Sequence, residues 1–155
     1  MRIEGSEAVT ILADPMTIWR MISDVTRTHE WSPDVIRSAW IAPADGPEVG
    51  ARFESVNRMP FVRRWRSRST VTRSDPGRTF AFAVGRDAAD PNTTWSWDLE
   101  SVNEGTYVKL SFEMRHEPPI VLLYYRLTKR PERVRRSVIA TLQRLRTLVE
   151  NPRRI

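Results

Sequence analysis

Hydrophobic and polar residues alternate along most of the chain, and this two-residue period is typical of half-buried β-strands. Turn-forming residues divide the alternating segments, most clearly Asp-Pro-Gly-Arg at positions 75–78 and Asn-Glu-Gly-Thr at 103–106. Short successive strands joined by such turns predict an antiparallel meander. The predicted strands cover residues 3–12, 35–41, 51–58, 64–73, 79–84, 94–102 and 107–115.

Other segments carry the three- and four-residue spacing of a helix with one buried face. Asp14 is a good N-cap and Pro15 fits a first helical position, so a short helix is predicted here. One further turn is predicted at residues 27–31, before the next proline ends the helical stretch. A long final helix is predicted over residues 131–150. Its apolar stripe consists of Val134, Val138, Leu142, Leu145 and Val149.

The order of these elements predicts an α+β fold. A curved seven-stranded antiparallel sheet is expected to wrap around the long C-terminal helix, with a pair of short helices between strands 1 and 2. A twisted sheet cannot lie flat, so its concave face and the helix are expected to enclose an apolar pocket. The 155 residues suit a single domain, 1–155, that buries a core of its own.

Composition narrows the classes of function. The chain is 40% hydrophobic and 28% charged, which is ordinary for a globular domain. No apolar run reaches the roughly 20 residues that span a bilayer, so no stable membrane insertion and a cytoplasmic location are expected. The absence of cysteine excludes disulfides and thiol catalysis. Motifs for binding phosphate or metal are missing, so we expect no cofactor and no metal site.

The formal charge of +6 comes mostly from arginines at residues 63–68 and 129–154. A basic surface can attract nucleic acid or anionic lipid. However, Arg66 and Arg68 alternate with Trp65 and Ser67, which is the pattern of a half-buried strand, and Arg133 lies mostly off the apolar stripe of the final helix. Both basic segments are therefore expected to be solvated faces, with no specific nucleic-acid partner.

Several short stretches combine with the order of elements into a pattern specific to one fold. They are Ala13-Asp14-Pro15, Ile18-Trp19, Ser23-Asp24-Val25-Thr26, Glu30-Trp31-Ser32-Pro33, Val49-Gly50-Ala51-Arg52-Phe53 and the segments 75–82 and 141–145. In these the chain resembles the START-like (SRPBCC) superfamily, and locally its bacterial polyketide cyclase/dehydrase branch. The resemblance covers nearly the whole chain and implies a helix-grip fold that holds a small hydrophobic ligand, such as a lipid, an isoprenoid or a polyketide-like molecule.

The same resemblance implies two alternatives. One is a polyketide aromatase/cyclase or dehydrase, and the other is a protein-interaction module such as a toxin-antitoxin component. A fold shared by so many functions transfers no reaction by itself.

If the more apolar face of each strand points inward, aromatic and small polar side chains line the pocket. Three tryptophans on neighbouring strands exceed the needs of a small core, and their buried N–H groups require partners. Inward polar side chains must pair with each other, with water or with a ligand, unless they reach solvent at a strand end. The predicted ligand-binding residues are Asn57, Trp65, Ser67, Ser69, Phe82, Trp95, Trp97, Phe112, Met114, His116 and Tyr124.

The aromatic rings also suit a solid core that holds no ligand. This second interpretation is favoured for Phe80, Phe82, Leu110 and Phe112, whose side chains are typical of protein interiors.

The catalytic residue is left unassigned, with His116 as the single candidate for a general acid or base. A hydrogen bond at the pocket rim is the alternative role for His116, because spacing brings no carboxylate or hydroxyl partner beside it. In the family that the chain resembles, arginine, tryptophan and tyrosine side chains orient the substrate. The matching candidates are Arg37 or Arg68, with Trp65 and Tyr124, although Arg68 has the outward parity of its strand.

Residues 120–125 form an apolar run that ends in two tyrosines. A pocket lid is the preferred interpretation, and a membrane-touching patch or a dimer interface are the alternatives. An edge strand near residues 86–92 could also support pairing with a second chain. The protein is therefore expected to be a monomer or a homodimer.

Overall fold

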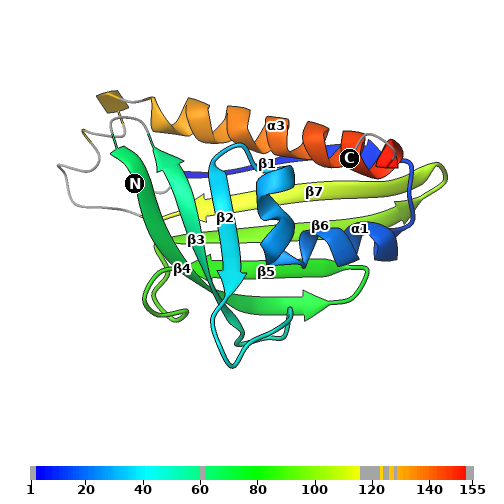
Figure 1. The fold of residues 1–155 in the computed structure, drawn as a ribbon. Helices are drawn as coiled ribbons and strands as arrows, with labels where there is room; N and C mark the ends of the chain where they lie inside the picture. Colours follow the sequence, from blue (N-terminus) through cyan, green and yellow to red (C-terminus); the bar gives the residue numbers. More distant parts are fainter. Residues whose placement is uncertain (1–2, 60–61, 116–122, 124–125, 128, 153–155) are drawn as a thin grey trace.

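Seven β-strands form a single antiparallel sheet in the computed structural model, which describes residues 3–59, 62–115, 123, 126–127 and 129–152 (Figure 1). The strand order is β1-β7-β6-β5-β4-β3-β2, so the first strand joins the far edge of an otherwise sequential meander. The strands are β1 (Ile3–Ile11), β2 (Val35–Trp40), β3 (Arg52–Met59), β4 (Val62–Asp75), β5 (Thr79–Val84), β6 (Thr93–Val102) and β7 (Gly105–Met114).

Two short helices connect β1 to β2. The helix α1 (Pro15–Ile22) begins after Asp14, whose carboxylate accepts a hydrogen bond from the Thr17 backbone at 3.0 Å. The 3-10 helix η1 (Val25–Glu30) begins in the same way after Asp24. The Asp14 cap stands where the sequence predicts a helix start, whereas η1 begins two residues before the turn predicted at residues 27–31.

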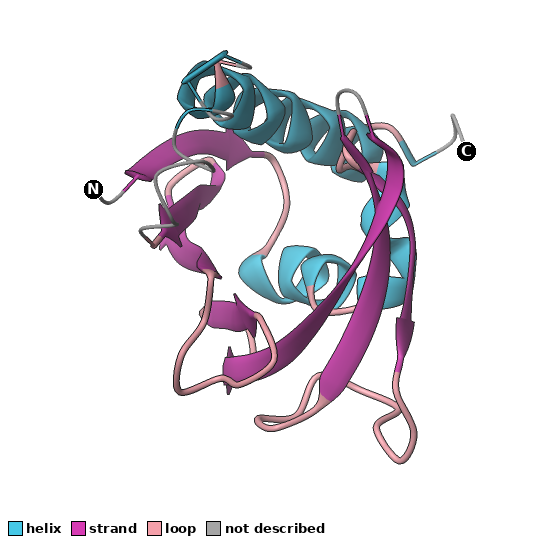
Figure 2. Ribbon diagram, turned by 90° about the vertical axis from the view of Figure 1, so that its left-hand side faces the viewer, coloured by secondary structure: helices cyan, strands magenta, loops and turns pink. Residues whose placement is uncertain are grey.

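The long helix α3 (Arg130–Glu150) lies across the open side of the curved sheet, alongside β1 (Figures 1 and 2). Its predicted stripe faces the interior, because Val134, Val138, Leu142 and Leu145 are all buried. The sheet therefore wraps around one long helix, which confirms the predicted helix-grip fold.

The predicted alternation also holds along the strands. In β7, Val108, Leu110 and Met114 are buried while Lys109 between them is exposed. On the outer face of β4, Arg68 lies 3.6 Å from the Glu54 carboxylate of β3.

Two local predictions are wrong. The loop between β6 and β7 is a two-residue turn rather than four residues, because Gly105 already pairs with Val102. Residues 86–92 form a loop between β5 and β6, as predicted, but the strands beside this loop are interior, because the edges of the sheet are β1 and β2. In both cases the outcome depends on pairing across the sheet, which local composition does not reveal.

Candidate ligand-binding cavity

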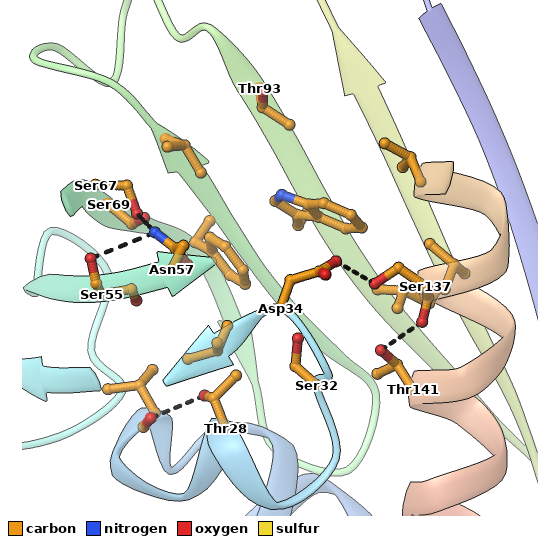
Figure 3. A pocket seen from close by; sticks show the side chains of 18 of the residues that line it. Thr28, Ser32, Asp34, Ser55, Asn57, Ser67, Ser69, Thr93, Ser137 and Thr141 are labelled. Carbon is orange, nitrogen blue, oxygen red and sulfur yellow. Dashed lines mark hydrogen bonds between the residues drawn. The ribbon is translucent and has the colours of Figure 1, made fainter. Parts of the chain in front are cut away.

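A cavity of about 180 Å³ lies between the concave face of the sheet, η1 and α3 (Figure 3). Its inner end is closed by α1, η1 and the middle of the sheet. The side chains at this end are buried and apolar: Ile22, Val25, Trp31, Phe80, Trp97, Leu110 and Val138.

The opposite end of the cavity opens where several strand ends meet. Asn57 of β3 pairs with Trp65 of β4, and Thr93 of β6 pairs with Met114 of β7, so these four residues share one end of the sheet. At this end Asn57, Trp65 and Thr93 are only half-buried, and Asp34 is exposed. The cavity therefore has a mouth at the end of the sheet near the first turns of α3.

Aromatic rings make up much of the cavity wall. Phe82 contacts Phe53 edge to face, with ring centroids 5.2 Å apart, and lies 6.0 Å from Phe80. Trp65 and Trp95 are half-buried, and both line the cavity. Flat apolar surfaces of this kind favour a planar, hydrophobic ligand.

A polar cluster interrupts the aromatic wall on β3 and β4 (Figure 3). The Asn57 side-chain amide donates to the Ser67 hydroxyl at 3.0 Å. The Ser55 hydroxyl shares a hydrogen bond of 2.7 Å with Ser38 of β2. These polar groups thus have partners within the protein, as expected for side chains that are shielded from solvent, and Ser55, Asn57 and Ser67 line the cavity.

A second polar group lines the α3 side of the mouth. Ser137 donates a short hydrogen bond to the Asp34 carboxylate, which joins the start of β2 to the helix (Figure 3). Arg133, Ser137 and Thr141 follow one another at four-residue intervals, so they form a row along α3 that lines the cavity.

Residue Glu30 helps to fix the η1 side of the cavity. Arg27 donates two hydrogen bonds to the Glu30 carboxylate, at 2.6 and 2.9 Å. These bonds hold the pKa of Glu30 below its ordinary value and raise the pKa of Arg27. Because Val25 and Thr28 of η1 line the cavity, this ion pair stabilises part of the wall.

Most of the predicted ligand-binding residues lie in the cavity wall. His116 and Tyr124 lie outside the described residues, as does nearly all of the predicted lid at 120–125. The predicted residues that line the cavity are Asn57, Trp65, Ser67, Ser69, Phe82, Trp95, Trp97 and Met114.

Phe112 points inward as predicted but does not line the cavity. Its ring lies over Gly5 of β1, where a Cβ atom would come within 3.0 Å of it. Its other neighbour is Trp95, with ring centroids 5.5 Å apart. The missing side chain at Gly5 leaves room for the ring on the β1 side, so Phe112 belongs to the packed core.

The arginines singled out from the family resemblance do not reach the cavity. Arg37 and Arg68 are exposed, and Arg68 pairs with Glu54 on the outer face. Instead Arg133, expected on the solvent face of the final helix, lines the cavity. The four-residue spacing from Arg133 to Ser137 and Thr141, beside the apolar stripe, is the signal that could have found this polar row.

Asp34 was also missed, because it follows a proline in a connection that reads as a surface loop. Its carboxylate reaches the cavity through the fold, since its partner Ser137 is 103 residues away along the chain. Local sequence carries no sign of that contact.

In the described part of the chain, no cluster of three or more His, Asp or Glu side chains could hold a metal ion. None of its helices is both long and apolar enough to cross a membrane.

Comparison with known proteins gives one family and several similar structures. A sequence model of the family described as "Polyketide cyclase / dehydrase and lipid transport" matches residues 2–150. No curated protein matches the chain. The Polyketide_cyc-like protein Cgl2372 from Corynebacterium glutamicum is 28% identical, with a TM-score of 0.62 over 97% of this chain and 93% of its own.

Two further solved structures share the fold at lower identity. The di-domain ARO/CYC protein StfQ of the steffimycin biosynthetic pathway is 14% identical, with a TM-score of 0.77. That match covers 100% of this chain and 53% of StfQ. The KanY protein is 20% identical, with a TM-score of 0.74 over 97% of this chain and 99% of its own.

Proposed function

The chain belongs to the polyketide cyclase/dehydrase and lipid transport family, and from this premise we propose that it binds a small, flat, hydrophobic molecule in the cavity between the sheet and α3. The observation that carries the proposal is the cavity wall itself. Trp65, Phe82 and Trp95 present aromatic surface to the cavity, while Asn57 and Ser67 add polar groups at one side. Apolar walls with few polar groups are typical of sites for small molecules.

The size of the cavity narrows the class of ligand. An engineered apolar cavity of about 150 Å³ holds one benzene molecule. The volume of about 180 Å³ therefore suits a compound of one or two rings. A long acyl or isoprenoid chain would have to extend through the mouth, so an aromatic or polyketide-like ligand is favoured over a lipid.

Neighbouring threonines on β6 provide a matched test of this proposal. Thr93 lines the cavity, whereas Thr94 lies on the opposite face of the same strand. Both side chains are half-buried. We expect the neutral compound 2-naphthamide to bind the wild-type protein in isothermal titration calorimetry. Thr93→Phe should weaken that binding at least about tenfold by filling the mouth, and Thr94→Phe should leave it within about twofold.

Two results would contradict cavity binding. One is an absence of measurable affinity for 2-naphthamide in the wild-type protein. The other is an equal loss in the Thr93→Phe and Thr94→Phe variants, because only one of the two side chains projects into the cavity.

A second candidate function, catalysis on a polyketide substrate, is favoured by one observation. Asp34 is the single carboxylate among the described residues that line the cavity, and Ser137 orients it. A positioned carboxylate can accept a proton from a carbon next to a carbonyl, and a bent chain held in a closed site reacts faster. An aromatase/cyclase or dehydrase would need both features.

The Asp34→Asn variant tests this second function, because it removes the proton acceptor while keeping the size of the side chain. If Asp34 acts as a base, the wild-type protein should accelerate cyclisation of a poly-β-ketone thioester by at least about a hundredfold over Asp34→Asn. Binding of 2-naphthamide should change little. Equal product yields and rates with the two proteins would exclude Asp34 as the base.

A further inference from the structure

The first turn of α3 carries an arginine that lines the cavity and has one buried nitrogen without a hydrogen-bond partner. Arg133 lines the cavity, and its Nη1 atom is shielded from solvent but has no hydrogen-bond partner. Among the described residues, no carboxylate forms an ion pair with Arg133. Buried donors in folded proteins nearly always have an acceptor, and a charged donor without one is especially unfavourable.

Other arginines of α3 show that the helix does offer its cations carboxylate partners. Arg135 lies 2.9 Å from Glu7 of β1, and Arg146 lies 3.4 Å from Glu150. Both of these arginines are more than half exposed, so water could solvate them without a partner. The Nη1 atom of Arg133, by contrast, is shielded from solvent, while Arg133 as a whole is half-buried and lines the cavity. The cavity therefore offers space for an acceptor beside this side chain.

The described groups around Arg133 do not supply that acceptor. Asp34 lines the same mouth, but its carboxylate accepts from the Ser137 hydroxyl, one helical turn beyond Arg133, and forms no ion pair with Arg133 among the described residues. Arg58, the other cation in the lining, already donates to the carbonyl oxygen of Pro33 at 3.1 Å. The N-terminal end of α3 adds positive potential through the helix dipole. This side of the mouth thus carries two cations, Arg58 and Arg133, and a helix N-terminus against the single carboxylate of Asp34, so its net charge favours an anion.

We infer that the ligand of this cavity carries a carboxylate, and that the guanidinium group of Arg133 binds it while the aromatic wall holds the ring system. This inference rests on the proposed function, because it names the chemical class of a ligand for the same cavity. The ligand is then an aromatic carboxylic acid rather than a neutral hydrocarbon or ketone. A charge-assisted hydrogen bond away from bulk water should favour the acid over a neutral compound of equal shape by about ten- to a hundredfold.

A pair of probes with the same shape tests this selectivity. 2-Naphthoate and 2-naphthamide share one ring system and differ in the charge of the substituent. With the wild-type protein, calorimetric titration should give a dissociation constant at least about tenfold lower for 2-naphthoate. Arg133→Met keeps the apolar stem of the side chain and should abolish this preference, with little change in the affinity for 2-naphthamide.

Arg136→Met is the matched control. Arg136 lies on the exposed face of the same helix, and this substitution removes the same positive charge. It should keep at least most of the preference for 2-naphthoate. Thermal unfolding of each variant establishes that it is folded. The comparison of the two probes on the wild-type protein needs no variant, so it remains decisive even if Arg133→Met does not fold.

The outcomes separate the inference from the proposed function. If both probes bind the wild-type protein equally well, the cavity binds hydrophobic molecules but the carboxylate inference is wrong. An equal loss of preference in Arg133→Met and Arg136→Met would assign the effect to overall charge and would also overturn it. If neither probe binds, the proposed function fails, and the inference fails with it.

Discussion

At the scale of single residues, the backbone conformation of one glycine determines how β7 begins between β6 and β1. Gly105 begins β7 with φ of 148°, a conformation that side chains with a Cβ atom rarely adopt. A Cβ atom built there would lie 2.2 Å from the carbonyl oxygen of Ile11 in β1. The close approach lets β7 pair with β1 and β6 from its first residues, so the turn before it can be short.

Replacement of Gly105 by alanine should therefore destabilise the fold. We expect Gly105→Ala to lower the free energy of unfolding by more than about 1 kcal/mol, because the new methyl group forces the backbone of β1 away. Urea denaturation measures this change. Gly46→Ala is the control, since nothing lies within 4 Å of a Cβ atom at that position. Equal stability of the two variants would show that the contact with Ile11 is relaxed at no cost.

At the scale of elements, η1 depends on an ion pair that pH can break. The carboxylate of Glu30 accepts both hydrogen bonds from Arg27, and its side chain is 22% exposed against 36% for Arg27. The pair spans the 3-10 helix that presents Val25 and Thr28 to the cavity. The packing of this wall element thus rests partly on charge, unlike that of α3, whose stripe is apolar.

The lowered pKa of Glu30 predicts the direction of a pH effect. A carboxyl group whose pKa is lower in the folded state stabilises the fold above its unfolded pKa. That contribution is lost as the pH falls through the folded pKa. Glu30→Gln should therefore lower the free energy of unfolding by about 0.5 kcal/mol at neutral pH, a value typical of partly exposed pairs.

Urea denaturation of wild type and Glu30→Gln between about pH 7 and pH 3 measures this effect. The difference between the two proteins should shrink as the carboxyl group is protonated. A difference that stays constant over the whole range would mean that the hydrogen bonds of Glu30 contribute without its charge.

At the scale of the whole molecule, the cavity exists because the sheet curves more than one helix can fill. The buried stripe of α3 packs against the sheet, but near the mouth the same helix presents the polar side chains of Arg133 and Ser137. The inner end of the cavity is closed by α1 and η1. A cavity with one apolar closed end and one polar open end matches the amphipathic ligand proposed above, with its ring inside and its charged group at the mouth.

The sequence by itself determined the fold class and the inward face of each strand. Alternation is a local property, since successive Cβ atoms of a strand point to opposite sides, so the inward parity of Trp65, Ser67 and Trp95 could be read without coordinates. The same holds for the helix starts at Asp14 and Pro15, because caps act over one turn.

Only the tertiary structure decided which inward residues reach the cavity and which polar groups join them. Phe112 has the right parity, yet the bare backbone of Gly5 on another strand takes its ring into the core. Arginine side chains are mostly exposed in proteins, yet the position of α3 over the sheet buries the Nη1 atom of Arg133. Asp34 meets Ser137 across 103 residues of chain. Such contacts depend on the curvature of the sheet and the placement of the helix, which no local pattern specifies.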